Sequence, residues 1–355
     1  MIGIIVPGNK KYTPYIQNYI EVLNRQRCDY RIMSWNKTGI QEDGIDFSFN
    51  YTVRDSNRKR MLWGYLRFIS ACKKCIRDNK IDKIIILTAA PAFFLGLHYL
   101  RKFKNSFLLD IRDDSPFIRK FPNQFKKICG MAKSVIVSSN EFSSWTGRST
   151  VLCHNVDLEQ LRIHIDDTPT NKVEMPIRIV FAGVMIEEQC NVEVLKAFKE
   201  DSRFSHFFIG RDCTGKSIIK KFTEEEHMSN VFFEGAYNKD EIIDIYREKA
   251  DLINIFRAKT TVNRNALPNK LYEAVLSGKP LVVFEHNKAV AKYSKDYYLG
   301  IVIPEELNCS INDYLYNQII VFDFDKYCFQ RKMFLKHVIE DMNLFKCTIE
   351  IFASE

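Results

Sequence analysis

Short apolar runs alternate with amphipathic stretches along most of the chain, and this alternation constrains the fold more than any other feature of the sequence. The first apolar run, residues 2–6, precedes a turn and then a stretch near 14–25 whose apolar residues recur at helical spacing. Strand, helix and strand in succession are typical of parallel sheets with helices on both faces. We therefore predict an α/β fold of the doubly wound type.

The same alternation predicts further elements in both halves of the chain. Strands are expected at 30–33, 83–87, 106–109 and 134–137, and helices near 59–78, 92–103 and 123–131. The pattern resumes from 177 to about 302, and a helical tract follows from about 327 to 345. With 355 residues and 46% apolar content, the chain is long enough for two domains that each have a core.

Residues 267–283 contain a helix start that suits an anion. A Pro-Asn pair that ends at Asn269 precedes a helical run with its apolar residues on one face. The free amides and the positive dipole end of such a start favour an anion, and Lys270 adds a full charge there. Glu273 follows one turn later, where its carboxylate can accept hydrogen bonds from ribose hydroxyls. An ordinary helix with a solvated lysine and glutamate would have the same sequence.

This stretch resembles the nucleotide-binding motif of retaining GT-B glycosyltransferases, especially the family 4 enzymes that build bacterial surface polysaccharides. The resemblance covers about residues 150–305. Its other motifs lie at 152–157, 179–183, 207–211 and 230–252. It implies the GT-B architecture, in which two Rossmann-like doubly wound domains face a cleft and a C-terminal helix crosses back to the first domain. We accordingly expect domains at 1–155, completed by about 325–355, and at 173–320.

The resemblance also implies where a nucleotide diphosphate-sugar donor would bind. In the second domain, Lys270 is expected to hold the diphosphate and Glu273 the ribose. The other donor-binding candidates are Gly183, Arg211, Asn269 and Leu271. Enzymes of this family generally need no metal or other cofactor, and they retain the anomeric configuration while the leaving phosphate oxygen takes the acceptor proton.

Two positions depart from the family pattern. The family usually has an acid eight residues before the position of Glu273, where this chain has Asn265, whose amide can hydrogen-bond a sugar hydroxyl. Asn265 is therefore kept as a catalytic candidate. The family also has an arginine and a lysine after Gly183, whereas residues 184–189 hold two acids and no base. The basic residues that could replace this pair are Arg211, Lys216 and Arg257.

In the first domain, two acids follow a predicted strand, where open α/β sheets place their sites. Asp113 and Asp114 are catalytic candidates on the acceptor side, or they cap the helix that follows them. Gly8 and Asn9, in the first turn, either approach a substrate through backbone amides or form a simple tight turn. His154 is a further catalytic candidate that either lines the cleft or belongs to the hinge strand.

Charge is divided unequally along the chain. Residues 1–155 carry 26 Lys and Arg against 12 Asp and Glu, a net +14, and the remainder carries 26 against 32, a net −6. Two basic clusters, 54–77 and 101–127, interleave with aromatic residues. These aromatics are Trp63, Tyr65, Phe68, Phe117, Phe121 and Phe125. The clusters fit an anionic membrane surface that presents a polyprenyl-linked oligosaccharide acceptor, or they are a solvated helical surface with its aromatics in the core.

Other classes of partner and site are disfavoured by the sequence. Nucleic acid is not expected, because the second half is acidic and no nucleic-acid-binding module is recognisable. Ten cysteines lack paired spacing apart from Cys72 and Cys75, so we expect reduced thiols without a zinc site. No apolar run of about 18 residues and no signal peptide is recognisable, so we expect a cytoplasmic protein, peripheral at the inner face of the membrane.

The expected function is transfer of a sugar from a nucleotide diphosphate-sugar to a growing, lipid-linked bacterial surface glycan of the capsule or O-antigen type. One alternative is a nucleotide-sugar epimerase of the same fold, which would need paired acids and further histidines. A second alternative is a degenerate, non-catalytic GT-B partner subunit, because the acid at Asn265 and the basic pair after Gly183 are missing.

Overall fold

The computed structural model describes residues 1–52, 58–169 and 173–355. The chain divides into two compact units, one of Met1–Asn155 with Glu340–Glu355 and one of Val156–Ile339. Residues 54–57 of the first predicted basic cluster, and the side chain of Arg58, lie outside the described part. All ten cysteines are free thiols.

Among the described residues, the first unit contains a sheet of seven parallel strands in the order β3-β2-β1-β4-β5-β6-β7. The strands are β1 (Ile2–Val6), β2 (Tyr30–Asn36), β3 (Phe47–Asn50), β4 (Lys83–Leu87), β5 (Phe107–Ile111), β6 (Ser134–Val137) and β7 (Val151–Leu152). Every residue of β1 and β5 is buried, because helices cover both faces of the sheet. The direction in which strands are added reverses between β1 and β4, which makes a topological switch point there.

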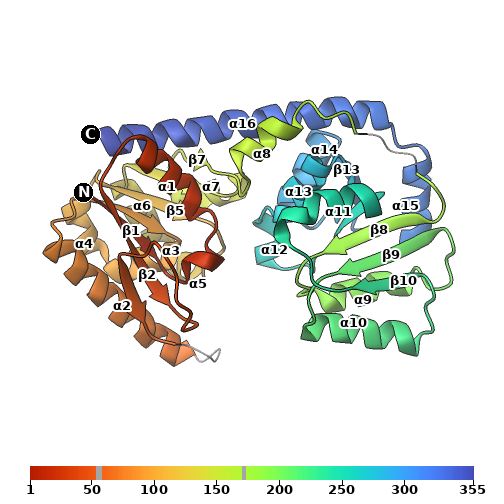
Figure 1. The fold of residues 1–355 in the computed structure, drawn as a ribbon, viewed down its shortest axis with the longest axis horizontal. Coiled ribbons are helices and arrows are strands. Elements are labelled where there is room, and N and C mark those ends of the chain that lie inside the picture. Colours follow the sequence, from red (N-terminus) through yellow and green to blue (C-terminus); the bar gives the residue numbers. More distant parts are fainter. Residues whose placement is uncertain (53–57, 170–172) are drawn as a thin grey trace. The chain divides into compact units, whose positions relative to one another are not determined.

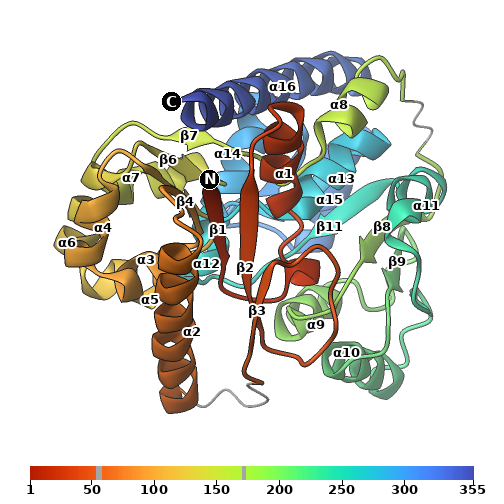
Figure 2. The ribbon, with the colours of Figure 1, turned by 60° about the vertical axis from the view of Figure 1, so that its left-hand side comes forward.

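Helices of the first unit lie on both faces of this sheet. They are α1 (Ile16–Arg25), α2 (Arg58–Asp78), α3 (Ala89–Leu95), α4 (Leu97–Leu100), α5 (Pro116–Lys120), α6 (Pro122–Met131) and α7 (Ser143–Thr146), with 3-10 turns η1 (Lys10–Tyr12), η2 (Arg101–Phe103) and η3 (Asn140–Phe142). Figure 2 shows α1 on one side of β1 and β2 and α2 on the other. Apolar faces such as that of α1, with Tyr19 and Leu23 fully buried, hold these helices to the sheet.

The described part of the second unit has six parallel strands in the order β10-β9-β8-β11-β12-β13. The strands are β8 (Ile177–Ala182), β9 (Phe204–Ile209), β10 (Val231–Glu234), β11 (Leu252–Ile255), β12 (Leu281–Phe284) and β13 (Gly300–Ile303). The helices are α8 (Leu158–His164), α9 (Glu188–Lys196), α10 (Thr214–Glu225), α11 (Ile242–Lys249), α12 (Thr261–Asn265), α13 (Asn269–Ser277), α14 (Lys288–Asp296) and α15 (Ile311–Ile320), with a 3-10 turn η4 (Lys239–Glu241). Figure 1 shows α9 and α10 on one face of the sheet and α11 and α13 on the other. The switch point here lies between β8 and β11.

Helix α16 (Phe324–Ser354) begins in the second unit and ends in the first. In the second unit its Arg331 is buried and donates to the backbone carbonyls of Val275, His164 and Asp167. These bonds fix the first half of α16 to α8 and α13, and they replace the water that a buried guanidinium would otherwise need.

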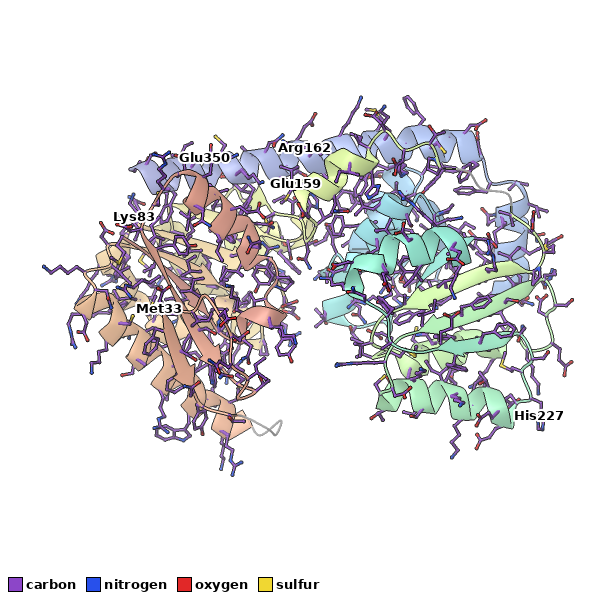
Figure 3. All side chains as sticks on the ribbon, in the orientation of Figure 1. Met33, Lys83, Glu159, Arg162, His227 and Glu350 are labelled. Carbon is purple, nitrogen blue, oxygen red and sulfur yellow. The ribbon has the colours of Figure 1, made fainter. Side chains whose placement is uncertain are left out.

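The last turns of α16 pack within the first unit. Phe345 meets Tyr19 of α1 edge to face, with ring centroids 5.1 Å apart. Lys83, at the start of β4, donates to the carbonyl of Phe352 at 2.9 Å and so caps the helix end; Figure 3 labels Lys83 and also Glu350 in the last turns. The C-terminal helix therefore returns to the first unit, as the sequence predicts. Among the described residues, no helix has both the length and the apolar character needed to span a bilayer.

Candidate functional site

Two of the predicted donor residues meet at the carboxyl edge of the second sheet. Gly183 directly follows β8, and the first turn of α13 brings Lys270 to it, so that a Cβ added at Gly183 would lie 3.0 Å from Lys270 Nζ. The ammonium lies over the ring of Phe181, 4.1 Å from its centroid. Open parallel sheets bind ligands at this edge, beside the switch point.

The turn at Gly183 is fixed by its neighbours. Gly183 adopts φ +137°, which side chains rarely tolerate. Gly210, at the end of β9, comes so close that a Cβ on it would lie 2.2 Å from the Gly183 carbonyl oxygen. The hydroxyl of Tyr246 accepts a hydrogen bond from the amide of Ala182 at 3.2 Å. A glycine held in this way leaves room for a ligand to approach the backbone closely.

The side chains of Lys270 and Glu273 are each partly exposed to solvent, and the protein around them is dense enough to shift the pKa of both. Burial lowers the pKa of Lys270, and the charge of Arg257 lowers it further, against the opposing effect of Glu273. Burial raises the pKa of Glu273, against the charges of Lys270 and Lys239. Burial and the charge of Glu273 raise the pKa of Tyr237 to about 12. An anion beside Lys270 would favour its charged form and relieve its repulsion with Arg257.

Glu187, one of the two acids after Gly183, organises the neighbouring loop. Its carboxylate accepts hydrogen bonds from the Asn263 side chain at 2.9 Å and from the Ala258 amide at 3.0 Å. The Nε of Arg257 lies 3.8 Å from the same carboxylate. The acid that replaces the family's basic pair thus helps to hold Arg257 near Lys270, and Arg257 remains the best placed of the predicted substitutes.

Lys216 and Arg211, the other two residues predicted to replace the basic pair, lie in different environments. Lys216 is buried and donates to the carbonyls of Gly210 at 3.0 Å and Glu234 at 2.9 Å, and to the carboxylate of Asp212 at 3.0 Å. All three of its N–H groups are therefore engaged within the loop structure, and the prediction that Lys216 binds the diphosphate is wrong. Arg211 is exposed after β9 and makes no hydrogen bond or ion pair with the described residues.

Three further predicted residues lie near the start of α13. Leu271 belongs to the core, and its amide donates to the carbonyl of Pro268 at 3.1 Å. Its side chain lies on the apolar face of α13, which packs inward, and its donor-binding role stays a prediction. Asn269 is exposed at the first position of the helix, next to Lys270. Asn265 is partly buried at the end of α12, and its catalytic role stays a prediction.

The carboxyl edge of the first sheet carries a pocket of about 560 Å³. Loops after β1, β2, β4 and β5 line this pocket, so it straddles the switch point between β1 and β4. The predicted acceptor-side residues all line it. They are Gly8, Asn9, Asp113 and Asp114. The structure thus brings together predicted residues from two loops that lie far apart in the sequence.

Gly8 and Asn9 contribute to the pocket in different ways. Asn9 is 2% exposed, and its amide donates to Asn36 at 2.9 Å and Glu42 at 3.0 Å while accepting from the backbone of Lys37 at 3.1 Å. It is therefore a structural clamp on the loop after β2. A Cβ on Gly8 would meet nothing within 4 Å, so Gly8 faces open space and a ligand can reach its backbone.

Neither acid of the predicted pair caps the following helix. The cap of α5 is Ser115, whose hydroxyl accepts from the Phe117 amide at 3.3 Å. The side chain of Asp114 is 1% exposed, with one oxygen paired to Arg119 and the other buried without a hydrogen-bond partner among the described residues. Asp113 is exposed on the pocket wall. The capping alternative is thus wrong, and both acids remain site candidates.

Two polar residues just before this acid pair serve the interior of the first unit. Asp110 and Arg112 form a buried ion pair, with Nε and Oδ1 2.8 Å apart. Tyr19 donates to the Asp110 carboxylate at 2.6 Å, and Arg112 donates to the carbonyl of Cys153 at 2.9 Å. Arg112 was counted in the second basic cluster as a surface residue, and this placement is wrong because its charge is paired inside the protein.

His154 is completely buried, and its Nε2 lies 3.0 Å from the Asp341 carboxylate of α16. The ring therefore joins the segment after β7 to the second half of α16. His154 therefore contributes to the packing of the first unit, and its catalytic role stays a prediction.

Sequence reasoning missed several residues beside these sites, namely Phe181, Tyr237, Lys37, Tyr65 and Thr88. Lys37 follows directly on β2, and its place at a strand's carboxyl end was a signal that could have found it. Among the described residues, no group of three or more His, Cys, Asp and Glu is placed to hold a metal ion. Metal-independent chemistry stays a prediction.

No protein-family model and no curated protein sequence matches the chain. Solved structures do match. Sucrose-phosphate synthase from Thermosynechococcus elongatus has TM-score 0.68 at 12% identity, over 100% of this chain and 99% of that one. A UDP-forming trehalose-phosphate synthase from Burkholderia vietnamiensis has TM-score 0.67 at 11% identity, over 99% and 97%. MurG from Acinetobacter baumannii has TM-score 0.54 at 10% identity, over 96% and 99%. The chain therefore has the two-domain GT-B glycosyltransferase fold that the sequence predicts.

Proposed function

We propose that the chain is a glycosyltransferase that binds a nucleotide diphosphate-sugar in its second unit and transfers the sugar to an acceptor held in its first unit. The contact between Gly183 and Lys270 carries this proposal. An ammonium that makes no ion pair with the described residues lies against an open glycine turn, at the edge of the sheet where ligands bind. A diphosphate is the group that this arrangement suits best.

The other residues around Lys270 support the same ligand. The start of α13 supplies backbone amides and the positive end of the helix dipole, and Arg257 adds a second cation for the leaving diphosphate. Glu273 stands about one turn further along α13, where its carboxylate would accept hydrogen bonds from the ribose hydroxyls of a nucleotide. A trehalose-phosphate synthase with the same fold is described as UDP-forming, which fits a donor whose leaving group is a nucleoside diphosphate.

For the chemistry, we propose retention of the anomeric configuration. The leaving phosphate oxygen would take the acceptor proton on the front face of the sugar, so that no strong protein base is required. Lys270, Arg257 and the α13 amides would stabilise the charge that develops on the diphosphate. Asn265 would hydrogen-bond a hydroxyl of the transferred sugar in place of the family's acid.

We further propose that the acceptor is a growing polyprenyl-linked glycan, of the capsule or O-antigen type, at the cytoplasmic face of a membrane. Helix α2 supports this, because Leu62, Trp63 and Leu66 are 45%, 64% and 51% exposed and share one helical face. Exposed Arg60 and Arg67 flank that face. Apolar side chains beside cations suit an anionic bilayer surface. The other predicted aromatics contribute less, since residues such as Phe68 and Phe125 are buried in the core.

A thermal-shift screen of the purified chain against UDP, GDP, CMP, dTDP and NAD tests the proposed donor site. At a ligand concentration of 100 times Kd, binding adds about 2.7 kcal/mol to the stability of the native state. We expect stabilisation by one nucleoside diphosphate, its loss in Lys270→Ala, and no change in Lys292→Ala, which removes an exposed lysine of α14. No shift with any nucleotide would favour the degenerate partner subunit instead. An equal shift in Lys270→Ala would show that Lys270 does not take part in nucleotide binding.

A further inference from the structure

We propose that the pocket of the first unit takes an acidic saccharide, with Lys37 pairing to the acid group of the ligand and Asp114 accepting hydrogen bonds from its hydroxyls. This names the acceptor class of the proposed transferase and, in that respect, rests on the proposed function. The two side chains line the same pocket but come from different strand ends, Lys37 after β2 and Asp114 after β5.

The ammonium of Lys37 is the strongest indication of an acidic ligand. It lies 4.3 Å from the ring centroid of Trp35 and 5.3 Å from that of Tyr65, and it makes no hydrogen bond or ion pair with the described residues. Burial lowers the pKa of Lys37 to about 8. Ring faces attract a cation but accept no conventional hydrogen bonds, so its three donors remain to be satisfied by water or by an anion.

The end of the pocket that is lined by Asp113 and Asp114 favours hydrogen-bond donors over anions. Asp114 presents a buried carboxylate oxygen that lacks a hydrogen-bond partner among the described residues, and Asp113 lies exposed on the same wall. Buried acceptors of this kind are normally paired, and a ligand hydroxyl would supply the missing donor. The two acids would repel an anionic group, so the acid group of the ligand belongs at the Lys37 end.

The strand order sets the size of the ligand. Strands β2 and β5 are separated by β1 and β4, which makes three strand spacings of about 4.8 Å each, or roughly 14 Å. This is longer than one sugar ring, and it suits either a sugar with an extended acidic substituent or a short acidic oligosaccharide. Aromatic rings such as Tyr12 and Tyr15 line the stretch between the two ends and can pack on the apolar faces of sugar rings.

Between the Lys37 end and the Asp114 end of the pocket, the backbone conformation lets a ligand approach closely. Gly8 opens onto empty space, and Thr88, between β4 and α3, adopts φ 66° and ψ 161°. A β-branched residue at positive φ is strained, and here it is held in place by the hydrogen bond from its amide to the carbonyl of Asp110 at 2.8 Å. Strain of this kind gathers at ligand sites, so the loop conformation favours binding over simple chain reversal.

Calorimetric titration of the full chain tests the proposal with glucose, glucose 6-phosphate, glucuronic acid and a neutral disaccharide as probes. We expect an acidic probe to bind at least tenfold more tightly than glucose. Lys37→Met, which keeps the stem between the rings but removes the charge, should abolish that difference. Gly8→Val, which fills open space without backbone strain, should weaken every probe. Lys127→Met, an exposed lysine of α6, is the matched control and should change nothing.

Comparing glucose 6-phosphate with glucuronic acid identifies the acid group. The probe that binds more tightly carries the group, phosphate or carboxylate, that Lys37 prefers. Binding of neither acidic probe, equal affinity for acidic and neutral probes, or a preference for acids that persists in Lys37→Met would overturn the proposal. A nucleoside diphosphate titrated into the same Lys37→Met sample separates this test from that of the donor site. Intact nucleotide binding shows that the proposed function can stand while the acceptor class fails.

Discussion

Replacing Arg112 by methionine should unfold the first unit far more readily, because it leaves the Asp110 carboxylate charged and without its ion-pair partner. Both side chains are buried, and their nitrogen and oxygen lie 2.8 Å apart. Breaking such a pair from one side costs about 3–5 kcal/mol, mainly because the remaining charge stays desolvated. Tyr19 still donates to the carboxylate at 2.6 Å in this variant, which favours the lower end of that range.

Tryptophan fluorescence in urea measures this effect on the first unit alone. The chain has three tryptophans, Trp35, Trp63 and Trp145, and all lie in the first unit. Trp35 is fully buried, so its emission will change on unfolding. With a urea m-value of about 2 kcal/mol/M, a loss of 3–5 kcal/mol moves the midpoint down by roughly 1.5–2.5 M.

The double variant Asp110→Asn with Arg112→Met provides the decisive comparison. It removes both charges while the asparagine can still accept from Tyr19, so it should be less destabilised than either single variant. Arg77→Met is the control, because its partner Asp78 and its own side chain are exposed and such pairs contribute about 0–1 kcal/mol. A midpoint shift below about 0.5 M for Arg112→Met, or losses that simply add in the double variant, would refute this reasoning.

Three further predictions concern the donor turn, a buried histidine and the membrane surface. Gly183→Ala should weaken nucleoside diphosphate binding in calorimetry, because its Cβ would lie 3.0 Å from the Lys270 ammonium and its φ of +137° strains an alanine; unchanged affinity would contradict the donor turn. Burial lowers the pKa of His206 to about 3, so the unfolded chain binds a proton below pH 6.5 that the folded chain excludes. The urea stability followed by circular dichroism should therefore fall by about 1.4 kcal/mol per pH unit between pH 6.5 and about pH 3, and a His206→Leu variant with the same acid dependence would disprove this. Leu66→Gln should reduce co-sedimentation with phosphatidylglycerol vesicles several-fold, whereas Ile351→Gln on α16 should not; equal losses would argue against the α2 surface.

The central strands of both sheets could be predicted from the sequence, because a strand buried on both faces reads as a continuous apolar run. The predicted bounds of β1, β4 and β6 agree with the structure. Strands β3 and β7 were missed, and both lie at the edges of the first sheet. β3 alternates half-buried with exposed residues and β7 has only two residues, so neither forms an apolar run.

Helix boundaries were predictable where capping residues mark them and not where backbone angles decide them. The helix predicted at 92–103 is broken into α3, α4 and η2, because Gly96 adopts φ 80° and ends α3. The apolar spacing continues across this break, so periodicity alone predicts a single helix. The last helix extends to Ser354, well beyond the predicted 345, and its apolar residues Ile349 and Phe352 are buried in that extension.

For the sites, local sequence motifs pointed to Lys270, Glu273 and Gly183, because a helix start and a glycine turn are contiguous signals. The structure brings Lys270 beside Gly183, and the role of these residues in donor binding stays a prediction. The burial of polar loop residues was not predictable in the same way. His154 and Arg112 find partners inside the fold, and only the three-dimensional packing reveals those partners. Lys37 becomes a site candidate only because the fold places its ammonium over the rings of Trp35 and Tyr65. Spacing along the chain does not encode such contacts.

Calorimetric titration with one nucleoside diphosphate, its monophosphate and its 2′-deoxy analogue tests the donor site most directly. Lys270→Ala should reduce diphosphate affinity by about 10- to 150-fold, the value of a hydrogen bond to a charged group, and so bring it close to that of the monophosphate. Glu273→Gln should instead weaken the preference for the ribose over the 2′-deoxy analogue. If both variants keep the wild-type order and strength of binding, the residues at the start of α13 do not form the donor site.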